Sequence, residues 1–316
     1  MSDPTSPSSS RLARRDALRC MALAGAGTVF ALCGGVLTPL SLADARERKS
    51  AARPLFVQIS DTHIGFHKEA NPDVDGTLNH AVEWINALPA APQFVLHTGD
   101  ITHLSKPEQF DRAASLLGRL RVTDLHTVPG EHDVADADVS EYFRRFGAVS
   151  NNRGYYAFDQ QGVHFIGLNN VMQAKDGGQG GLGDEQLRWV LDDLKRRSSS
   201  TPIVVFAHMP LWSIYEPWGW ATADAAPVID SLRRFGSVSV LNGHIHQIVQ
   251  KEEGHIRFHT ARSTAFPQPA PGQGPGPGPL KVDPAELAGA LGVTSVTIDP
   301  YPRSLVLADT SLADAT

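Results

Sequence analysis

The sequence predicts a layered α/β fold in which mixed β-sheets are flanked by helices. From Leu55 onward, short apolar segments alternate with polar loops and amphipathic segments, as in strands followed by helices. After Gly154, closely spaced apolar segments are joined by tight turns, which indicates antiparallel hairpins. Because no internal repeat is present, we expect one layered architecture with both parallel and antiparallel strands.

The overall composition is that of an ordinary globular protein with a sizeable core. Hydrophobic residues make up 41% of the 316 residues and charged residues 20%. The formal net charge is -6, and the body of the chain contains no run rich in lysine and arginine. We therefore predict that the protein has no nucleic-acid-binding surface.

Residues 1–45 are interpreted as an export signal and excluded from the fold. Arg14 and Arg15 precede a weakly apolar, glycine-rich stretch, and an A-x-A cleavage sequence follows at 43–45. The segment resembles a twin-arginine signal, which implies the twin-arginine export machinery as a partner and a periplasmic or otherwise exported location. The alternative is an uncleaved membrane anchor, but the glycines favour a mature form with no stable membrane span.

Both cysteines, Cys20 and Cys33, fall within this excluded segment. The mature chain therefore has neither a disulfide nor a thiolate ligand. Any metal ion that it binds must be held by histidine, aspartate, glutamate and related side chains.

The first part of the mature chain predicts alternating strands and helices. Strands are expected at 55–59, 94–96 and 124–128, and helices at 76–88, 107–120 and 138–146. Ser105 and Glu108 have the spacing of a capping box, and Pro107 suits an early helical position.

The second part predicts a hairpin at 155–158 and 163–168, a helix at 184–197, and strands at 203–206 and 237–241. A second hairpin is expected at 248–249 and 256–258, and final strands at 293–298 and 305–307. The Pro/Gly-rich segment 268–279 could be a linker. Only about 37 residues follow it, too few for another domain, so we interpret it as a surface loop of a single domain, 46–316.

Ionisable side chains follow five of the predicted strands. The clusters are D-T-H at 61–63, G-D at 99–100, G-E-H-D at 130–133, His208, and G-H-I-H at 243–246. Sites in α/β sheets form at the carboxyl ends of the strands, so we expect these clusters to meet.

Within D-T-H and H-I-H, alternate residues of an extended segment point the same way and can reach one metal ion. Carboxylates and imidazoles without cysteine suit Mn, Fe or Zn. A lone histidine such as His164 or His255 is more simply explained as an ordinary core or surface residue.

The order and spacing of these motifs, from Asp61 to His246, resemble those of the calcineurin-like metallophosphoesterases. The resemblance implies a four-layer αββα sandwich of two mixed sheets, with a dinuclear metal centre at its rim. Segments 156–168 and 181–189 further resemble the cyclic-nucleotide phosphodiesterase branch.

The resemblance also implies roles for individual residues. One metal ion would be held by Asp61, His63 and His246, the second by Glu131, His208 and His244, and Asp100 would bridge them. His132 matches the catalytic histidine of the family, and Asp133 matches the carboxylate that orients it.

Glu131 departs from the family motif G-N-H-[DE]. Glutamate is negatively charged, reaches one methylene further than asparagine and donates no hydrogen bond when ionised. Together with Asp61, Asp100 and a bridging hydroxide, it would neutralise two divalent ions. Either the site then attracts phosphate more weakly, or one of the two ions is trivalent iron beside a divalent ion, and we favour the second. A third alternative is that Glu131 coordinates much as asparagine would. The expected cofactors are two metal ions, Fe and/or Mn, with Zn as an alternative.

Three further residues are candidates for substrate contact: His103, Trp212 and Arg262. The aromatic segment 211–220 could stack on a base or cover an apolar leaving group. Packing is the alternative for the aromatic residues, and a surface role is the alternative for His103.

The predicted function is that of an exported, dinuclear metal-dependent phosphoesterase. Its small phosphorylated substrate would be a phosphodiester, cyclic nucleotides included, cleaved by a metal-activated hydroxide while His132 stabilises or protonates the leaving oxygen. The alternatives are a phosphomonoesterase of the same fold and, because of Glu131, a catalytically weak metal-binding or sensor protein.

Overall fold

The computed structural model describes residues 28–33, 36–41, 54–134, 139–174, 178–298 and 305–315. The chain divides into two units, Met1–Ala52 and Arg53–Thr316. In the first, strands β1 (Thr28–Cys33) and β2 (Val36–Ser41) form an antiparallel hairpin. The twin arginines and the sequence 43–45 lie outside the described residues, so the signal peptide and the boundary at residue 45 remain predictions.

A five-stranded mixed sheet forms half of the second unit. Its order is β13 (Leu305–Ser311), β12 (Gly292–Ile298), β3 (Phe56–Ile59), β4 (Phe94–His97) and β5 (Leu125–Thr127). Strands β3, β4 and β5 are parallel, whereas β12 pairs antiparallel with both β13 and β3. The carboxyl ends of β3, β4 and β5 therefore lie at one edge of the sheet.

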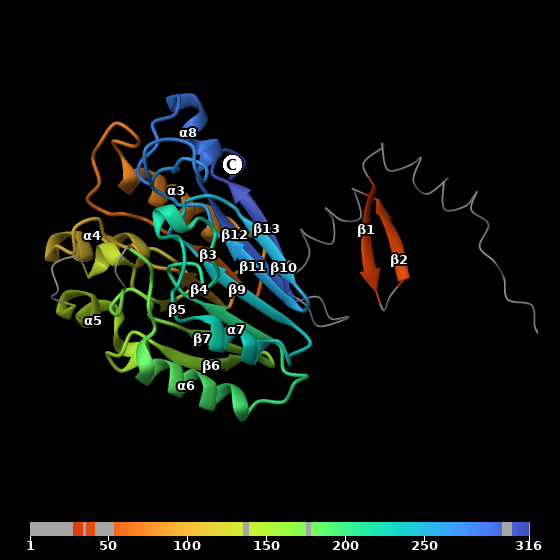
Figure 1. The fold of residues 1–316 in the computed structure, drawn as a ribbon. Helices are drawn as coiled ribbons and strands as arrows, with labels where there is room; N and C mark the ends of the chain where they lie inside the picture. The colour runs from red at the N-terminus through yellow and green to blue at the C-terminus, as the bar shows by residue number, and fades with distance from the viewer. Residues whose placement is uncertain are drawn as a thin grey trace, which may run out of the picture. The chain divides into compact units, whose positions relative to one another are not determined.

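A six-stranded mixed sheet forms the other half (Figure 1). Its order is β10 (Gln250–Glu253), β11 (Ile256–Thr260), β9 (Val238–Asn242), β8 (Ile203–Phe206), β7 (Val163–Gly167) and β6 (Tyr156–Gln160). The central strands are parallel, and the outer hairpins β6–β7 and β10–β11 are antiparallel.

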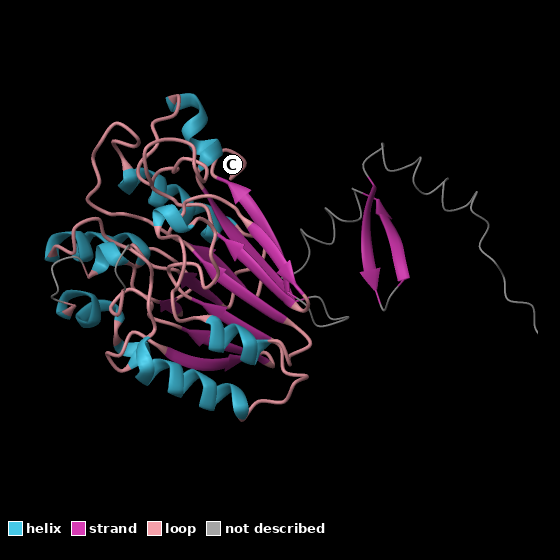
Figure 2. Ribbon diagram, viewed as in Figure 1, coloured by secondary structure: helices cyan, strands magenta, loops and turns pink. Residues whose placement is uncertain are grey.

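Helices cover the outer face of each sheet (Figure 2), and this confirms the predicted αββα architecture. On the five-stranded sheet lie α3 (Val74–Ala87), α4 (Pro107–Leu117), α5 (Ser140–Phe146) and α8 (Pro284–Ala290). On the six-stranded sheet lie α6 (Gly183–Lys195) and α7 (Ala226–Leu232). Along β8, Val205 faces the helices and Val204 faces the other sheet, as the two-residue period of a strand requires.

Aromatic side chains fill the space between the two sheets. Phe165 on β7 is fully buried and stacks on Phe158, with their ring centroids 4.8 Å apart. Its ring also meets the edges of Phe56 and Phe94 from the five-stranded sheet, at 5.7 and 5.3 Å. These close ring contacts join the two sheets in the interior of the sandwich.

Three local expectations differ from the structure. Helices α7 and α8 were not anticipated, and the strand expected at 248–249 is formed by Gln250–Glu253 instead. The capping box at Ser105 is wrong, because Lys106 is the N-cap of α4 and makes no side-chain cap hydrogen bond. The Ser105 hydroxyl instead donates to the carbonyl of His132, at 2.8 Å.

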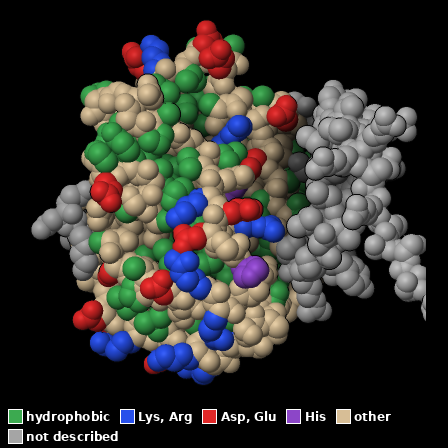
Figure 3. Space-filling view, turned by 45° about the vertical axis from the view of Figure 1, so that its right-hand side comes forward, with side chains coloured by type: hydrophobic (Ala, Val, Ile, Leu, Met, Phe, Trp, Pro, Cys, Tyr) green, Lys and Arg blue, Asp and Glu red, His purple; other side chains and the backbone are tan. Residues whose placement is uncertain are grey.

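The face of the molecule drawn in Figure 3 carries lysine and arginine side chains interspersed with aspartate and glutamate. No helix in the described ranges combines the length and hydropathy needed to cross a membrane.

The inter-sheet core generates a stability prediction. We expect Phe165→Ala to lower the free energy of unfolding by about 3 to 5 kcal/mol, because it opens a cavity among three aromatic rings. Urea unfolding followed by circular dichroism measures the loss. Val306→Ala is the control, since Val306 is 46% exposed. An equal, small effect of both substitutions would contradict this account of the core.

Candidate metal centre

The ionisable clusters predicted from the sequence meet where the two sheets end side by side. From the five-stranded sheet come Asp61 and His63 after β3, Asp100 after β4, and Glu131 in the 3-10 helix η2 (Glu131–Asp133) after β5. From the six-stranded sheet come His208 after β8, and His244 and His246 after β9. All seven belong to overlapping groups that could hold a metal ion.

Most of these residues have a left-handed backbone. The φ angles are 53° at Asp61, 41° at His63, 54° at Asp100, 71° at His244 and 54° at His246. Non-glycine residues rarely adopt this conformation, and it concentrates at functional sites where surrounding structure enforces it.

Two glycines are required by the close approach of the loops. A Cβ at Gly130 would collide with the backbone and carboxylate of Asp100, and a Cβ at Gly243 would collide with Ser60 and the Asp61 carboxylate. The glycines that begin the G-E-H-D and G-H-I-H motifs thus allow one motif to pack directly on another.

The first group consists of Asp61, His63 and His246. The Nε2 atoms of His63 and His246 are 3.2 Å apart, and His246 Nε2 lies 3.3 Å from Asp61 Oδ1. Metal–ligand bonds of about 2.1 Å place neighbouring ligand atoms roughly 3 to 3.5 Å apart. The spacing of these buried atoms therefore fits one metal ion.

The second group consists of Glu131, His208 and His244. Glu131 Oε2 lies 2.8 Å from His208 Nε2, and Oε1 lies 2.9 Å from His244 Nδ1. Glu131 Oε2, His208 Nε2 and His244 Nδ1 are nevertheless buried without a partner in hydrogen-bond geometry. Close but unaligned donor and acceptor atoms fit a shared ligand set better than a network of ion pairs.

Asp100 lies between the two groups. Its Oδ2 is 3.5 Å from His63 Nε2 and 3.4 Å from His208 Nε2. Its Oδ1 accepts a hydrogen bond from the backbone N–H of His132, at 2.9 Å. One carboxylate oxygen is thus held by the protein, and the other faces both groups at nearly equal distance.

The electrostatics of the cluster favour ligands in their metal-binding forms. Burial raises the pKa of Asp61, but His246 and His208 outweigh it and lower the pKa to about 2. Burial likewise opposes the ionisation of Glu131, whose pKa is held well below its ordinary value by His244 and His208. Burial and the neighbouring imidazoles lower the pKa of His63 well below its ordinary value, so its ring is neutral.

His132 stands beside the two groups, with its ring centroid 4.8 Å from that of His63. Its Nδ1 donates to the carbonyl of His103, at 2.8 Å, which leaves Nε2 to carry the second proton or receive one. Burial lowers the pKa of His132, but the carboxylates of Asp100 and Glu131 outweigh it, and the pKa lies above its ordinary value.

Asp133, which the sequence predicts to orient His132, has a carboxylate whose recorded hydrogen bonds go to other groups. The Asp133 carboxylate is fully buried and accepts hydrogen bonds from the backbone N–H groups of Ile101, Thr102 and Gly130, at 2.8 to 3.0 Å. The Thr102 hydroxyl adds a fourth hydrogen bond, at 3.0 Å. Asp133 therefore fastens the loop after β4 to the loop after β5, and a backbone carbonyl fixes the tautomer of His132.

The three candidates for substrate contact occupy different surroundings. His103 lies beside His63 and His132. Trp212 packs on Phe258 in the core between the six-stranded sheet and its helices. Arg262 donates to the carbonyl of Gly289 at the end of α8, at 2.8 Å. The surroundings of Trp212 and Arg262 do not support substrate contact.

Sequence reasoning missed Phe266, which has no ionisable group and follows β11. Its ring stacks on His63, and it also lies 4.8 Å from the ring of His246. Its carbonyl accepts from His246 Nδ1, at 2.6 Å. No side-chain pattern signals a role that rests on a backbone carbonyl.

The contacts of Asp133 predict a structural effect of its substitution. At pH 8 the carboxyl is ionised, because burial and Asp100 raise its pKa only to about 6. We expect Asp133→Asn to lower the free energy of unfolding of the metal-free protein by about 1.5 to 3 kcal/mol, since an amide NH2 would face backbone donors. Urea unfolding in chelator tests this, with the exposed Asp230→Asn as control. Unchanged stability would show that the loops do not depend on the carboxylate.

Comparisons with known proteins find relatives that are named as phosphoesterases. A probable glycerophosphodiester phosphodiesterase of Arcobacter nitrofigilis is 28% identical over 160 residues, which cover 50% of this chain and 58% of that protein. A serine/threonine-protein phosphatase of Mus musculus is 27% identical, covering 64% of this chain and 72% of that protein. The chain thus spans less than two thirds of the first of these relatives.

Two solved structures share the fold. A dimetal phosphatase from Danio rerio has a TM-score of 0.57 at 15% identity, covering 82% of this chain and 97% of that one. Purple acid phosphatase from yellow lupin has a TM-score of 0.60 at 12% identity, covering 83% and 52%. Residues 54–248, which include all seven clustered side chains, match the calcineurin-like phosphoesterase family, and the chain belongs to that family.

Proposed function

We propose that this protein is a dinuclear metal-dependent phosphodiesterase. The observation that carries the proposal is the position of Asp100 Oδ2, 3.5 Å from His63 Nε2 and 3.4 Å from His208 Nε2, between two groups that could each hold a metal ion. Asp61, His63 and His246 would hold one ion, Glu131, His208 and His244 the second, and Asp100 would contact both. Two bound cations would activate water and stabilise charge on the phosphoryl oxygens.

The protein supplies proton transfer and orientation. With Nδ1 held by the carbonyl of His103, the second ring nitrogen of His132 is positioned as a general acid for the leaving oxygen. The Asp133 carboxylate holds the loop that carries this carbonyl. His132 is therefore the proposed catalytic residue, and Asp133 positions it through the backbone.

A diester is favoured because the Arcobacter relative is named as a glycerophosphodiester phosphodiesterase. The other relative is named as a protein phosphatase, which keeps a phosphomonoester as the second candidate. Cyclic nucleotides are among the diesters to be tested. Arg14 and Arg15, with the A-x-A sequence at 43–45, support export through the twin-arginine pathway as part of the proposal.

The bond class can be tested with residues 46–316 loaded with Mn or Fe. We expect an aryl phosphodiester to be hydrolysed faster than the matching monoester, and His132→Ala to lower that rate by about 10²- to 10⁴-fold, because the leaving oxygen loses its acid. Initial rates would be compared with those for a glycerophosphodiester and a 3′,5′-cyclic nucleotide.

His255→Ala is the matched control, since His255 is exposed and lies outside the ligand groups. Faster turnover of the monoester would assign the second candidate. No turnover by a folded, metal-loaded protein would favour a metal-binding protein without catalysis.

Glu131 supports a proposal about the metal ions. Asp61, Asp100 and Glu131 supply three negative charges, so a trivalent ion beside a divalent ion keeps more positive charge for an anionic substrate than two divalent ions do. Iron with a divalent partner such as Mn, Fe or Zn is therefore the proposed pair.

We expect Glu131→Asn to shift the bound metal toward two divalent ions, because it removes a negative charge that lies between His208 and His244. Elemental analysis and the spectrum of the purified protein measure the shift. The exposed Glu252→Gln serves as control. Identical metal content and rates in Glu131→Asn and the unsubstituted protein would contradict the charge argument.

A further inference from the structure

Each clustered imidazole has one ring nitrogen that points away from the ligand groups, here called its outer nitrogen. The imidazoles differ in the group that this outer nitrogen contacts. The Nδ1 of His208 contacts the carbonyl of Thr98 at 2.7 Å, and that of His246 contacts the carbonyl of Phe266 at 2.6 Å. A carbonyl can only accept, so each ring carries its proton on Nδ1 and presents Nε2 to the cluster.

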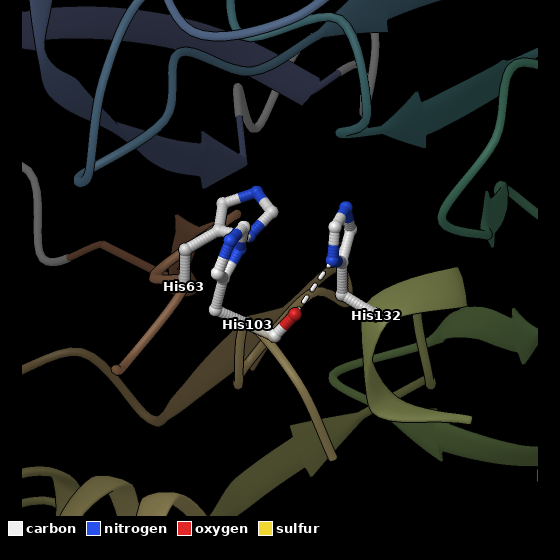
Figure 4. Close-up of side chains that lie close together, drawn as sticks. All are labelled: His63, His103 and His132. Carbon is white, nitrogen blue, oxygen red and sulfur yellow. Dashed lines mark hydrogen bonds between the residues drawn. The ribbon is translucent and has the colours of Figure 1, made fainter. Parts of the chain in front are cut away.

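His63 is held differently, by a side chain. Its Nε2 faces the cluster, 3.2 Å from His246 Nε2 and 3.5 Å from Asp100 Oδ2. Its outer nitrogen, Nδ1, lies 3.4 Å from Nδ1 of His103. Figure 4 shows the rings of His63, His103 and His132 lying close together. Within the described ranges, His103 is the one hydrogen-bond partner recorded for His63 Nδ1.

We propose that His103 is a positioning residue that selects the metal-binding nitrogen of His63. If Nε2 of His63 binds metal, its proton sits on Nδ1 and must be donated to an acceptor. Nδ1 of His103 supplies that acceptor when its own proton is on Nε2. The inference rests on the proposed function, since it assumes that His63 is a metal ligand.

The surroundings of His103 hold its ring in place. The ring stacks on that of His132, with centroids 4.9 Å apart and planes 15° from parallel, and it meets the ring of Phe66 edge-on at 5.2 Å. The backbone N–H of His103 donates to the carbonyl of Ile64, at 3.0 Å. His103 thus contacts His63 through its side chain. It contacts His132 through both its ring and its backbone carbonyl.

Because His103 contacts His63 through its side chain and holds His132 through its carbonyl, substitution of the side chain can test the proposal. A change of side chain at residue 103 removes the acceptor for His63 but leaves the carbonyl that holds His132. Loss of a hydrogen-bond partner behind a metal ligand typically weakens metal binding by about 10- to 100-fold. We expect that loss in His103→Leu, which keeps the bulk of the side chain and removes both nitrogens.

Asparagine and glutamine distinguish the two nitrogens of His103. The amide oxygen of asparagine can lie where Nδ1 lies, whereas the amide of glutamine reaches the position of Nε2. An acceptor for His63 is therefore restored by His103→Asn and not by His103→Gln. The opposite pattern, rescue by glutamine alone, would assign His103 to a contact made through Nε2 and overturn the proposal.

The experiment is calorimetric titration of Mn²⁺ into metal-free full-length protein, with thermal unfolding to confirm that each variant is folded. His255→Leu is the matched control, because His255 is exposed and lies outside the ligand groups. We expect one of the two binding steps to weaken about 10- to 100-fold in His103→Leu and His103→Gln, and to recover in His103→Asn.

The readout separates this inference from the proposed function. Unsubstituted protein that binds two ions while His103→Leu binds them equally well would overturn the inference alone. Unsubstituted protein that binds neither Mn²⁺ nor, in a parallel titration, Fe²⁺ or Zn²⁺ would overturn the proposed function and the inference together. Metal affinity that follows the expected pattern supports the inference whether or not any ester is hydrolysed.

Discussion

The candidate metal centre depends on a backbone that its ligand residues would not adopt by themselves. A left-handed residue other than glycine costs about 1 to 2 kcal/mol, and five of the seven clustered residues have that conformation. The loops enforce it on each other: the N–H of Asp61 donates to the carbonyl of Gly99, and the N–H of His63 to the carbonyl of Asp100, both at 3.0 Å. Main-chain hydrogen bonds therefore help to hold the clustered residues in this arrangement.

The sequence was informative about most of the clustered residues because they follow strands that are buried throughout, β3, β4, β8 and β9. A strand end fixes where the next side chains lie, so D-T-H, G-D and G-H-I-H could be assigned to one edge without knowing the loops. The hydrogen bonds that hold the loops of the site could not be predicted in this way. Asp133 acts on the N–H groups of Ile101, Thr102 and Gly130, and backbone groups are the same in every sequence. Ser105 matched a capping pattern, yet its loop turns the hydroxyl toward His132.

The fold shows the same limit. Strands such as Ile203–Phe206 are buried on both faces and were predicted correctly from their apolar residues. Strand β10, Gln250–Glu253, lies at the edge of its sheet, and its sequence Q-K-E-E carries no apolar residue to reveal it. The short helices α7 and α8 have too few turns for a periodic pattern to stand out.

The clustered residues extend from both sheets, and this affects how strongly the two sheets are held together. Asp61 and His63 extend from the five-stranded sheet, while His246, in the same group, extends from the six-stranded sheet. Glu131 likewise follows a strand of the first sheet, and its partners His208 and His244 follow strands of the second. An ion in either group would act as a clasp between the layers, and its binding free energy would add to the adhesion of the two sheets. The aromatic core would then hold the two sheets together in their interior, and the ions would hold them together at the strand ends that carry the candidate metal centre.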